Sequence, residues 1–323
     1  MTASCQPGIE RNAATSAVGE SALRSTHALP DWFVTARDKA GGRYGSVMYD
    51  DCRIAYQTWG RAGQPALLLI HGAGASSEWW EATAILLADS FHIVAPSFAG
   101  CGRSQWRESY RMDQAVAEAL ACADAEFGSD NPTRPACVAH SFGSEAGVRL
   151  AIDPARPISQ LVLVDSLMGL YESPDSSFPR RERLFYPSTE DAVRRFSTVP
   201  RDAFGPQSLR DHVALQSLEA TTSPQGNSSW SWRADPNVMA GMDCPPVFDR
   251  IGDACCPIDI VYGGRSSMNS ADLRASQVSR IMQHCELIGI DESGHHILLD
   301  RPIELSNAIR RLVGLRSQGG SVP

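Results

Sequence analysis

Residues 136–152 of the chain read A-C-V-A-H-S-F-G-S-E-A-G-V-R-L-A-I. Residues 137–139 form an apolar run of strand length, and residues 145–152 are rich in helix formers. Ser141 lies between them, and strand, serine, helix is the order of a nucleophile elbow, a sharp turn that exposes the hydroxyl above the sheet edge. Such a turn needs small neighbours, and Ala139 stands where the usual G-x-S-x-G pattern has its first glycine. The stretch predicts a nucleophilic Ser141, with an ordinary strand–helix turn as the alternative.

A glycine-containing loop, H-G-A-G at residues 71–74, directly follows the apolar run 67–70. A loop in this position can direct a backbone N–H at an oxyanion, and the residue after the nucleophile supplies the second donor. We therefore expect the amides of Ala73 and Phe142 to form an oxyanion hole, with a tight turn between strand and helix as the alternative. His71 is expected to stabilise the loop.

A pair of histidines lies near the end of the chain, in the sequence G-H-H at residues 294–296. A late histidine on a loop can reach over the sheet edge and act as general base to the serine. His295 directly follows Gly294 and is our candidate for this role. His296 is the local alternative.

Taken together, these motifs resemble those of the α/β-hydrolase fold superfamily. The matching segments are H-G-A-G, S-F-A-G-C-G-R-S at 97–104, A-H-S-F-G at 139–143 and G-H-H-I-L-L-D-R-P at 294–302, and the resemblance extends over residues 46–313. It implies an α/β protein with a mostly parallel eight-stranded sheet flanked by helices and an inserted helical cap. It also implies a member similar to serine esterases and lipases or to C–C hydrolases.

The pattern along the chain agrees with such a fold, because short apolar runs alternate with helix-forming stretches, as in a mostly parallel sheet. The apolar runs lie at 67–70, 92–95, 137–139, 161–164, 258–262 and 286–290, and the helical stretches at 79–89, 112–126 and 145–152.

The alternation stops between about residues 168 and 250, where prolines separate short amphipathic pieces. A segment of this length is too long for a structureless loop in a compact domain. We expect a disordered tail at 1–30, a hydrolase core at 31–166 and 251–316, and a helical cap at 167–250.

The catalytic acid is the least obvious member of the site. Most of the superfamily has it after the seventh strand, but residues 261–267 read V-Y-G-G-R-S-S and contain no carboxylate. Some members place the acid after the sixth strand, and Asp165 follows the apolar run 161–164 in this chain. The resemblance therefore implies that Asp165 orients His295. Three other carboxylates remain alternatives: Asp272, Asp291 and Glu292.

Aromatic side chains are the candidates for a substrate pocket. Trp79 and Trp80 follow the H-G-A-G loop, Trp230 and Trp232 lie in the expected cap, and His140 precedes the nucleophile. We expect these five residues to line an apolar, aromatic pocket. The alternative is that most of them are core residues.

Three functions are compatible with these residues. A serine nucleophile with a histidine base and an oxyanion hole fits hydrolysis of a carboxylic ester or lactone of a small to medium apolar substrate through an acyl-enzyme. The alternatives are a serine-dependent C–C hydrolase of the meta-cleavage-product type and a non-catalytic ligand receptor on a hydrolase fold.

Composition excludes other classes. The 29 Lys and Arg against 37 Asp and Glu give a net charge of −8, which argues against a nucleic-acid partner. The longest clean apolar run, residues 66–70, is far shorter than the about 20 residues of a membrane span. Neither a metal-ligand pattern nor a dinucleotide fingerprint is present, so we expect no cofactor and no metal. A small-molecule substrate and a cytoplasmic location are expected, and the sequence leaves a homodimer open.

Overall fold

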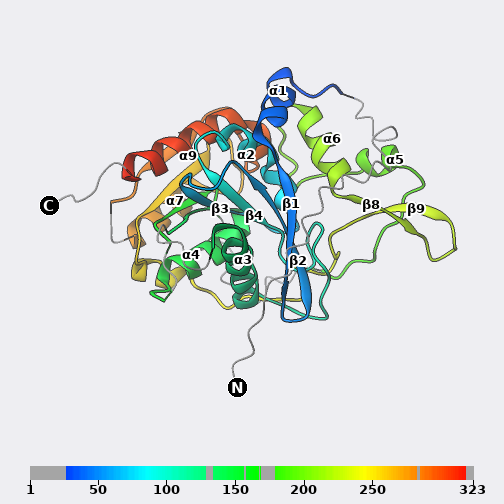
Figure 1. The fold of residues 1–323 in the computed structure, drawn as a ribbon, viewed down its shortest axis with the longest axis horizontal. Coiled ribbons are helices and arrows are strands. Elements are labelled where there is room, and N and C mark those ends of the chain that lie inside the picture. The colour runs from blue at the N-terminus through cyan, green and yellow to red at the C-terminus, as the bar shows by residue number, and fades with distance from the viewer. Residues whose placement is uncertain are drawn as a thin grey trace.

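The computed structural model describes residues 27–128, 134–155, 158–166, 168, 179–281 and 284–317. Its centre is an eight-stranded sheet in the order β1-β2-β4-β3-β6-β7-β11-β12, with helices on both sides (Figure 1). β2 pairs antiparallel with β1 and β4, and the other neighbouring strands pair in parallel. The mostly parallel eight-stranded sheet is therefore confirmed. The strands are β1 (Arg43–Tyr49), β2 (Cys52–Trp59), β3 (Ala66–Ile70), β4 (His92–Pro96), β6 (Ala136–His140), β7 (Gln160–Val164), β11 (Ile258–Gly263) and β12 (Leu287–Ile290).

The central strands are buried on both faces. In β3, Leu67 and Leu69 join the hydrophobic cluster on one face of the sheet, while Leu68 and Ile70 join the cluster on the other. Successive side chains of a strand point to opposite faces, so a strand between two helical layers must be apolar at every position. This is why these strands stand out in the sequence as continuous apolar runs.

Two helical layers cover the sheet. Phe33 of α1, Leu87 of α2 and Leu305 of α9 belong to the first hydrophobic cluster, and Ala119 of α3 and Val148 of α4 belong to the second. The carboxyl ends of the parallel strands share one edge, so the loops that follow them meet there. The helices of these layers are α1 (Asp31–Ala40), α2 (Glu81–Leu87), α3 (Met112–Phe127), α4 (Ser144–Ile152), α7 (Ala271–Arg280) and α9 (Pro302–Ser317).

The segment between β7 and β11 contains strands as well as the expected helices, and the strands are a feature that the expectation of a helical cap did not include. Its elements are α5 (Thr189–Val193), α6 (Gln207–Gln216), β8 (Leu218–Thr222), β9 (Ser228–Trp232) and β10 (Met242–Asp243), which pairs with β5 (Tyr110–Arg111). β8 and β9 form an antiparallel hairpin, which extends with α5 and α6 to one side of the sheet (Figure 1). Side chains of β9 alternate in burial, with the two-residue period of a strand. This period was not recognised in the Ser- and Trp-rich sequence.

Helix α6 packs against the core around the eight-stranded sheet. Leu209 belongs to the first hydrophobic cluster. The guanidinium of Arg210 contacts Asp300 Oδ1 at 2.8 Å, and His212 Nε2 lies 2.7 Å from Glu81 Oε2. All four of these polar side chains are buried. The segment 167–250 thus remains our proposed cap, with α6 as its anchored part.

Most of the predicted tail, residues 1–26, lies outside the described residues. Where the description begins, His27 Nδ1 lies 2.9 Å from Asp211 Oδ2 of α6, and α1 follows directly. Among the described residues, none of the helices has the length and apolar character required to cross a membrane.

Candidate active site

Ser141 lies in a sharp turn between β6 and α4. Its backbone φ is +55°, a left-handed conformation that non-glycine residues adopt at a cost of about 1–3 kcal/mol. The turn is crowded, because a Cβ at Gly143 would lie 2.4 Å from the carbonyl oxygen of His71. The sequence therefore folds here into the strained turn expected of a nucleophile elbow, with glycine where the backbone of the neighbouring loop approaches.

Three predicted side chains form one continuous hydrogen-bonded chain. The hydroxyl of Ser141 lies 2.8 Å from His295 Nε2, and His295 Nδ1 lies 2.6 Å from Asp165 Oδ2. Ser141 is 5% exposed, His295 2% and Asp165 0%. In this arrangement the Nδ1–H donates to the carboxylate, so Nε2 keeps the lone pair that accepts from the serine hydroxyl.

Asp165 is held in place by the end of strand β11. The backbone N–H of Gly263 donates to Asp165 Oδ1 at 2.9 Å, and the Ser266 hydroxyl donates to Oδ2 at 2.6 Å. Within the part of the chain that the structure describes, His295 is the only ion-pair partner found for Asp165. Within the described residues no lysine or arginine competes with His295 for this carboxylate.

The three alternative carboxylates lie elsewhere. Asp272 is exposed in the first turn of α7, and Asp291 is exposed after β12. Glu292 is also exposed and forms an ion pair with Arg265. None of them is among the hydrogen-bond partners found for His295 in the described ranges.

The H-G-A-G loop lies directly against the serine. A Cβ at Gly72 would be 2.9 Å from the Ser141 Cβ, so only glycine permits this approach. Ala73 is exposed in the same turn, and Phe142 N lies in the first turn of a short 3-10 helix (Ser141–Gly143), where backbone N–H groups have no partner within the helix. The Phe142 amide thus directly follows Ser141 in the chain, and the Ala73 amide directly follows Gly72, the residue that approaches the serine.

His71 fixes this loop, as expected. Its Nδ1–H donates to the carbonyl of Gly72 at 2.8 Å, and its Nε2 accepts the backbone N–H of Phe98 at 3.1 Å. Burial lowers the pKa of His71 to about 4, only partly offset by the hydrogen bond to Gly72. A neutral imidazole therefore joins the H-G-A-G loop to the loop after β4.

A family model described as the alpha/beta hydrolase family matches residues 67–308. The chain belongs to this family. The matched range contains the serine, the aspartate and the histidine of the hydrogen-bonded chain.

Two curated relatives of this α/β hydrolase carry the word hydrolase in their names. A Shigella flexneri protein named as a carbamate hydrolase, RutD, is 30% identical over 208 residues, which is 62% of this chain and 73% of that protein. An uncharacterised hydrolase of Saccharomyces cerevisiae is 31% identical over 104 residues, 32% of this chain and 35% of the yeast protein. Family membership and these relatives support a hydrolase activity.

Solved structures share the fold at low sequence identity. A thioesterase domain from the curacin biosynthetic pathway has a TM-score of 0.69 and 20% identity, covering 83% of this chain and 99% of that domain. An esterase of Mycobacterium tuberculosis has a TM-score of 0.66 and 21% identity, covering 90% of this chain and all of that protein (100%).

Two further histidines surround His295 in this α/β hydrolase. His140 Nε2 lies 2.9 Å from the carbonyl oxygen of His295, and His296 Nε2 lies 3.2 Å from that of Val199. Burial, with the neighbouring histidines, lowers the pKa of His140 well below its ordinary value and that of His296 to about 3. Both rings are therefore neutral at pH 7. One nitrogen from each of the three rings lies within 4.8 Å of the others, so the fold assembles a metal-capable group that the sequence had not indicated.

The predicted aromatic residues take different places. The Trp79 ring lies 5.5 Å from that of His296 and 6.0 Å from that of Phe196, which in turn lies 5.7 Å from Trp232. Trp79 and Trp232 thus belong to one aromatic row that leads from the histidines into the proposed cap.

Trp80 and Trp230 lie outside that row. Trp80 is fully buried, with its ring 6.4 Å from that of His140. Trp230 packs on the small cluster of Tyr186, Ala192 and Leu218 inside the proposed cap. The structure brings His140 directly against His295 and leaves Trp230 within its own hairpin cluster.

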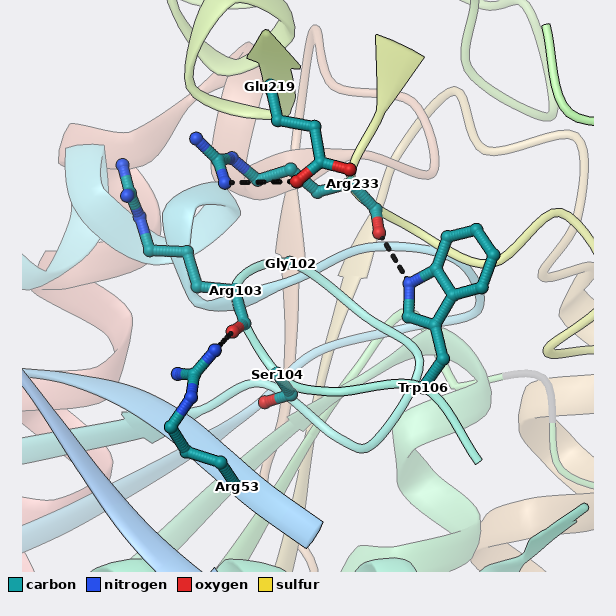
Figure 2. Close-up of a pocket in the computed structure, with 7 residues that line it drawn as sticks. All are labelled: Arg53, Gly102, Arg103, Ser104, Trp106, Glu219 and Arg233. Atoms are coloured by element: carbon teal, nitrogen blue, oxygen red, sulfur yellow. Dashed lines mark hydrogen bonds and ion pairs between the residues drawn. The ribbon is translucent and has the colours of Figure 1, made fainter. Parts of the chain in front are cut away.

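A polar pocket of about 360 Å³ lies where the hairpin meets the loop after β4 (Figure 2). Trp106 Nε1 donates to the carbonyl of Arg233 at 2.9 Å, and the Arg233 guanidinium lies 3.6 Å from Glu219. The first of these contacts ties the end of the hairpin to the loop after β4, and the second lies within the hairpin. The lining residues are Arg53, Gly102, Arg103, Ser104, Trp106, Glu219 and Arg233.

Sequence reasoning missed three contributors to the site. Gly263 and Ser266 hold Asp165, but nothing local marks them, because the contact forms only when β7 and β11 pair. Asp300 accepts the backbone N–H of Gly294 at 2.9 Å and contacts Arg210, so it supports the loop that carries His295. Asp300 lies within the quoted G-H-H-I-L-L-D-R-P segment, which was the available signal.

Proposed function

We propose that this α/β hydrolase is a serine hydrolase that cleaves a carboxylic ester or lactone of a small to medium apolar substrate. The observation that carries the proposal is the chain from Ser141 Oγ through His295 to Asp165, with separations of 2.8 and 2.6 Å. A serine hydroxyl is a weak nucleophile unless an adjacent base accepts its proton. His295 is in place to do so, and Asp165 stabilises the imidazolium that forms.

The reaction proceeds in two halves. The Ser141 oxygen attacks the carbonyl carbon while its proton passes to His295 Nε2, and the carbonyl oxygen becomes an oxyanion. The C–O bond to the alcohol then breaks, His295 returns the proton to the leaving oxygen, and an acyl-enzyme remains. Water attacks the acyl-enzyme by the same proton route and releases the acid and Ser141.

The oxyanion is assigned to the amides of Ala73 and Phe142. The close approach of Gly72 to Ser141 supports this assignment, because it brings the H-G-A-G loop to the nucleophile. Fixed donors that meet the developing charge contribute about 2.7–4 kcal/mol each to transition-state stabilisation. The aromatic row of Trp79, Phe196 and Trp232 supports an apolar substrate group on the side of the proposed cap.

A carbamate is the second candidate substrate. The similarity to RutD, which is named as a carbamate hydrolase, favours it. The same nucleophile, base and oxyanion donors serve for both, because both reactions begin with addition to a carbonyl carbon. The two differ in the group left on Ser141: an ester leaves an acyl group that water releases as an acid, whereas a carbamate ester leaves a carbamoyl group whose hydrolysis product decomposes to amine and CO₂.

The test combines covalent labelling with turnover. We expect the full chain to react with a fluorophosphonate probe and to hydrolyse short p-nitrophenyl esters. Ser141→Ala should abolish labelling and lower turnover at least about 10³-fold. Ser279→Ala, which changes an exposed serine of α7, is the matched control and should leave both unchanged.

Other outcomes point to the other functions. Labelling of Ser141 without ester turnover, but with release of amine from a carbamate, replaces the ester by the second candidate. Labelling with cleavage of a ring-fission product alone indicates the C–C hydrolase. A wild-type protein that neither labels nor turns over any of these substrates refutes catalysis and favours the ligand receptor.

A further inference from the structure

Three histidines meet at the centre of the site although one suffices for catalysis. His140, His295 and His296 are each no more than 6% exposed. Their ring centroids are 4.9–5.8 Å apart. One nitrogen from each ring lies within 4.8 Å of the other two. Two of these rings have no part in the hydrolytic cycle described above, so their convergence calls for a separate explanation.

Each ring is held through one nitrogen by an acceptor. His295 Nδ1 donates to the Asp165 carboxylate, His140 Nε2 to the carbonyl of His295, and His296 Nε2 to that of Val199. Metal-binding histidines are held in the same way, with one N–H on a carboxylate or backbone carbonyl and the other nitrogen on the metal. All three rings are thus oriented as metal ligands would be.

The opposite nitrogens retain lone pairs. In the described part of the chain, no hydrogen-bond partner is found for His140 Nδ1 or His296 Nδ1, although both atoms are buried. Buried polar atoms without a partner are uncommon, so each of these two nitrogens is available to a ligand. The third lone pair, on His295 Nε2, faces the Ser141 hydroxyl. The three rings that meet here thus carry two unused acceptors, on His140 and His296, and one acceptor that faces the nucleophile.

We propose that His140, His295 and His296 form a binding site for a divalent transition-metal ion, Zn²⁺ or Cu²⁺, and that the bound ion stops hydrolysis. Imidazole nitrogens suit zinc and copper, whereas Mg²⁺ and Ca²⁺ require oxygen ligands. Zinc binds histidine at 2.0–2.1 Å, which places tetrahedral ligands about 3.3 Å apart, so nitrogens that lie up to 4.8 Å apart close in by at most about 1.5 Å. The ion occupies the Nε2 lone pair of His295, and Ser141 then has no base.

Binding is measured without reference to any substrate, so its outcome is independent of the proposed function. We titrate the full chain with ZnCl₂ by calorimetry and expect one site per chain, with no heat from MgCl₂ or CaCl₂. Pulsed EPR of the Cu²⁺-loaded wild type should show coupling to three imidazoles. Absence of zinc binding, or coupling to fewer imidazoles, overturns the proposal without any variant.

Variants locate the site. His140→Ala and His296→Ala should each weaken zinc binding at least about tenfold, because each removes one ligand. His284→Ala changes an exposed histidine and should bind zinc like the wild type. Circular dichroism checks that each variant is folded. Equal zinc affinity in all four proteins identifies binding elsewhere on the surface and refutes the site.

The inhibition is tested on the labelling reaction and, where ester turnover is found, on turnover. Zinc should block fluorophosphonate labelling of Ser141, and EDTA should restore it. Zinc that binds to the three histidines but leaves labelling unchanged refutes the inhibitory part of the proposal.

Discussion

The Ser266 hydroxyl donates to Asp165 Oδ2 at 2.6 Å. Ser266 belongs to the loop after β11, the place where most related hydrolases carry their catalytic acid, according to the resemblance seen in the sequence. In this chain Ser266 of that loop and the amide of Gly263 at the end of β11 donate hydrogen bonds to an acid that directly follows the neighbouring strand β7. The carboxylate thus lies after β7, and the loop after β11, its usual place in related hydrolases, holds that carboxylate by hydrogen bonds instead.

Asp165→Asn should lower kcat by about 10²–10⁴-fold while the fold is retained. The amide offers His295 no charge and can hold it in the wrong tautomer. The measurement is kcat on a p-nitrophenyl ester, with thermal unfolding as the check on folding. Asp272→Asn, at an exposed alternative carboxylate, should have no effect. A large loss at Asp272 with little loss at Asp165 would reverse the assignment.

Ser266→Ala should lower kcat by about tenfold. It removes one charge-assisted hydrogen bond from Asp165, and such bonds contribute about 1.5–3 kcal/mol. Ser267→Ala is the matched control, because the Ser267 hydroxyl bonds to Asp202 and does not touch Asp165. In the Asp165→Asn variant, Ser266→Ala should lower kcat little further, because Ser266 acts only by holding the Asp165 carboxylate. Additive losses in the double variant would mean that Ser266 acts by another route.

The unfolding free energy should depend on pH through His71. Its pKa in the folded chain is about 4, below the ordinary 6.5, so the unfolded chain binds the proton first. Stability therefore falls as pH drops from about 6.5 to about 4, by about 1.4 kcal/mol per pH unit for this histidine. His71→Asn removes the titration, and urea unfolding between pH 7 and 4.5 should show a shallower slope by about one proton. Parallel curves for the two proteins would contradict this role.

Gly143→Ala should destabilise the fold by about 1–3 kcal/mol, since the new Cβ would meet the His71 carbonyl at 2.4 Å. Gly314→Ala in α9 is the contrasting change, because a Cβ there has no heavy atom within 4 Å. That variant should gain up to about 1 kcal/mol from helix propensity. Thermal unfolding of both measures the difference. If Gly143→Ala left the thermal stability unchanged, the turn after β6 and the H-G-A-G loop would be free to move apart.

Local sequence patterns were sufficient where structure is decided locally. The strand–serine–helix order located Ser141, and the continuous apolar runs located the strands that are buried on both faces. The hairpin β8–β9 was missed because its strands carry Ser and Thr among few apolar residues, with no continuous apolar run. The Ser266 contact and the three-histidine cluster could not be read at all. Each joins segments more than 100 residues apart (Ser266 and Asp165 by 101, His140 and His295 by 155), and only the pairing of strands brings them together.

Because of helix α6, the proposed cap and the rest of the protein cannot be exchanged as independent parts. Arg210 of α6 contacts Asp300, and Asp300 holds the backbone of Gly294 beside His295. A chimera that replaces residues 167–250 with the cap of another hydrolase would remove the guanidinium and leave a buried carboxylate uncompensated. Grafts intended to change substrate preference should therefore keep α6 and exchange the hairpin alone.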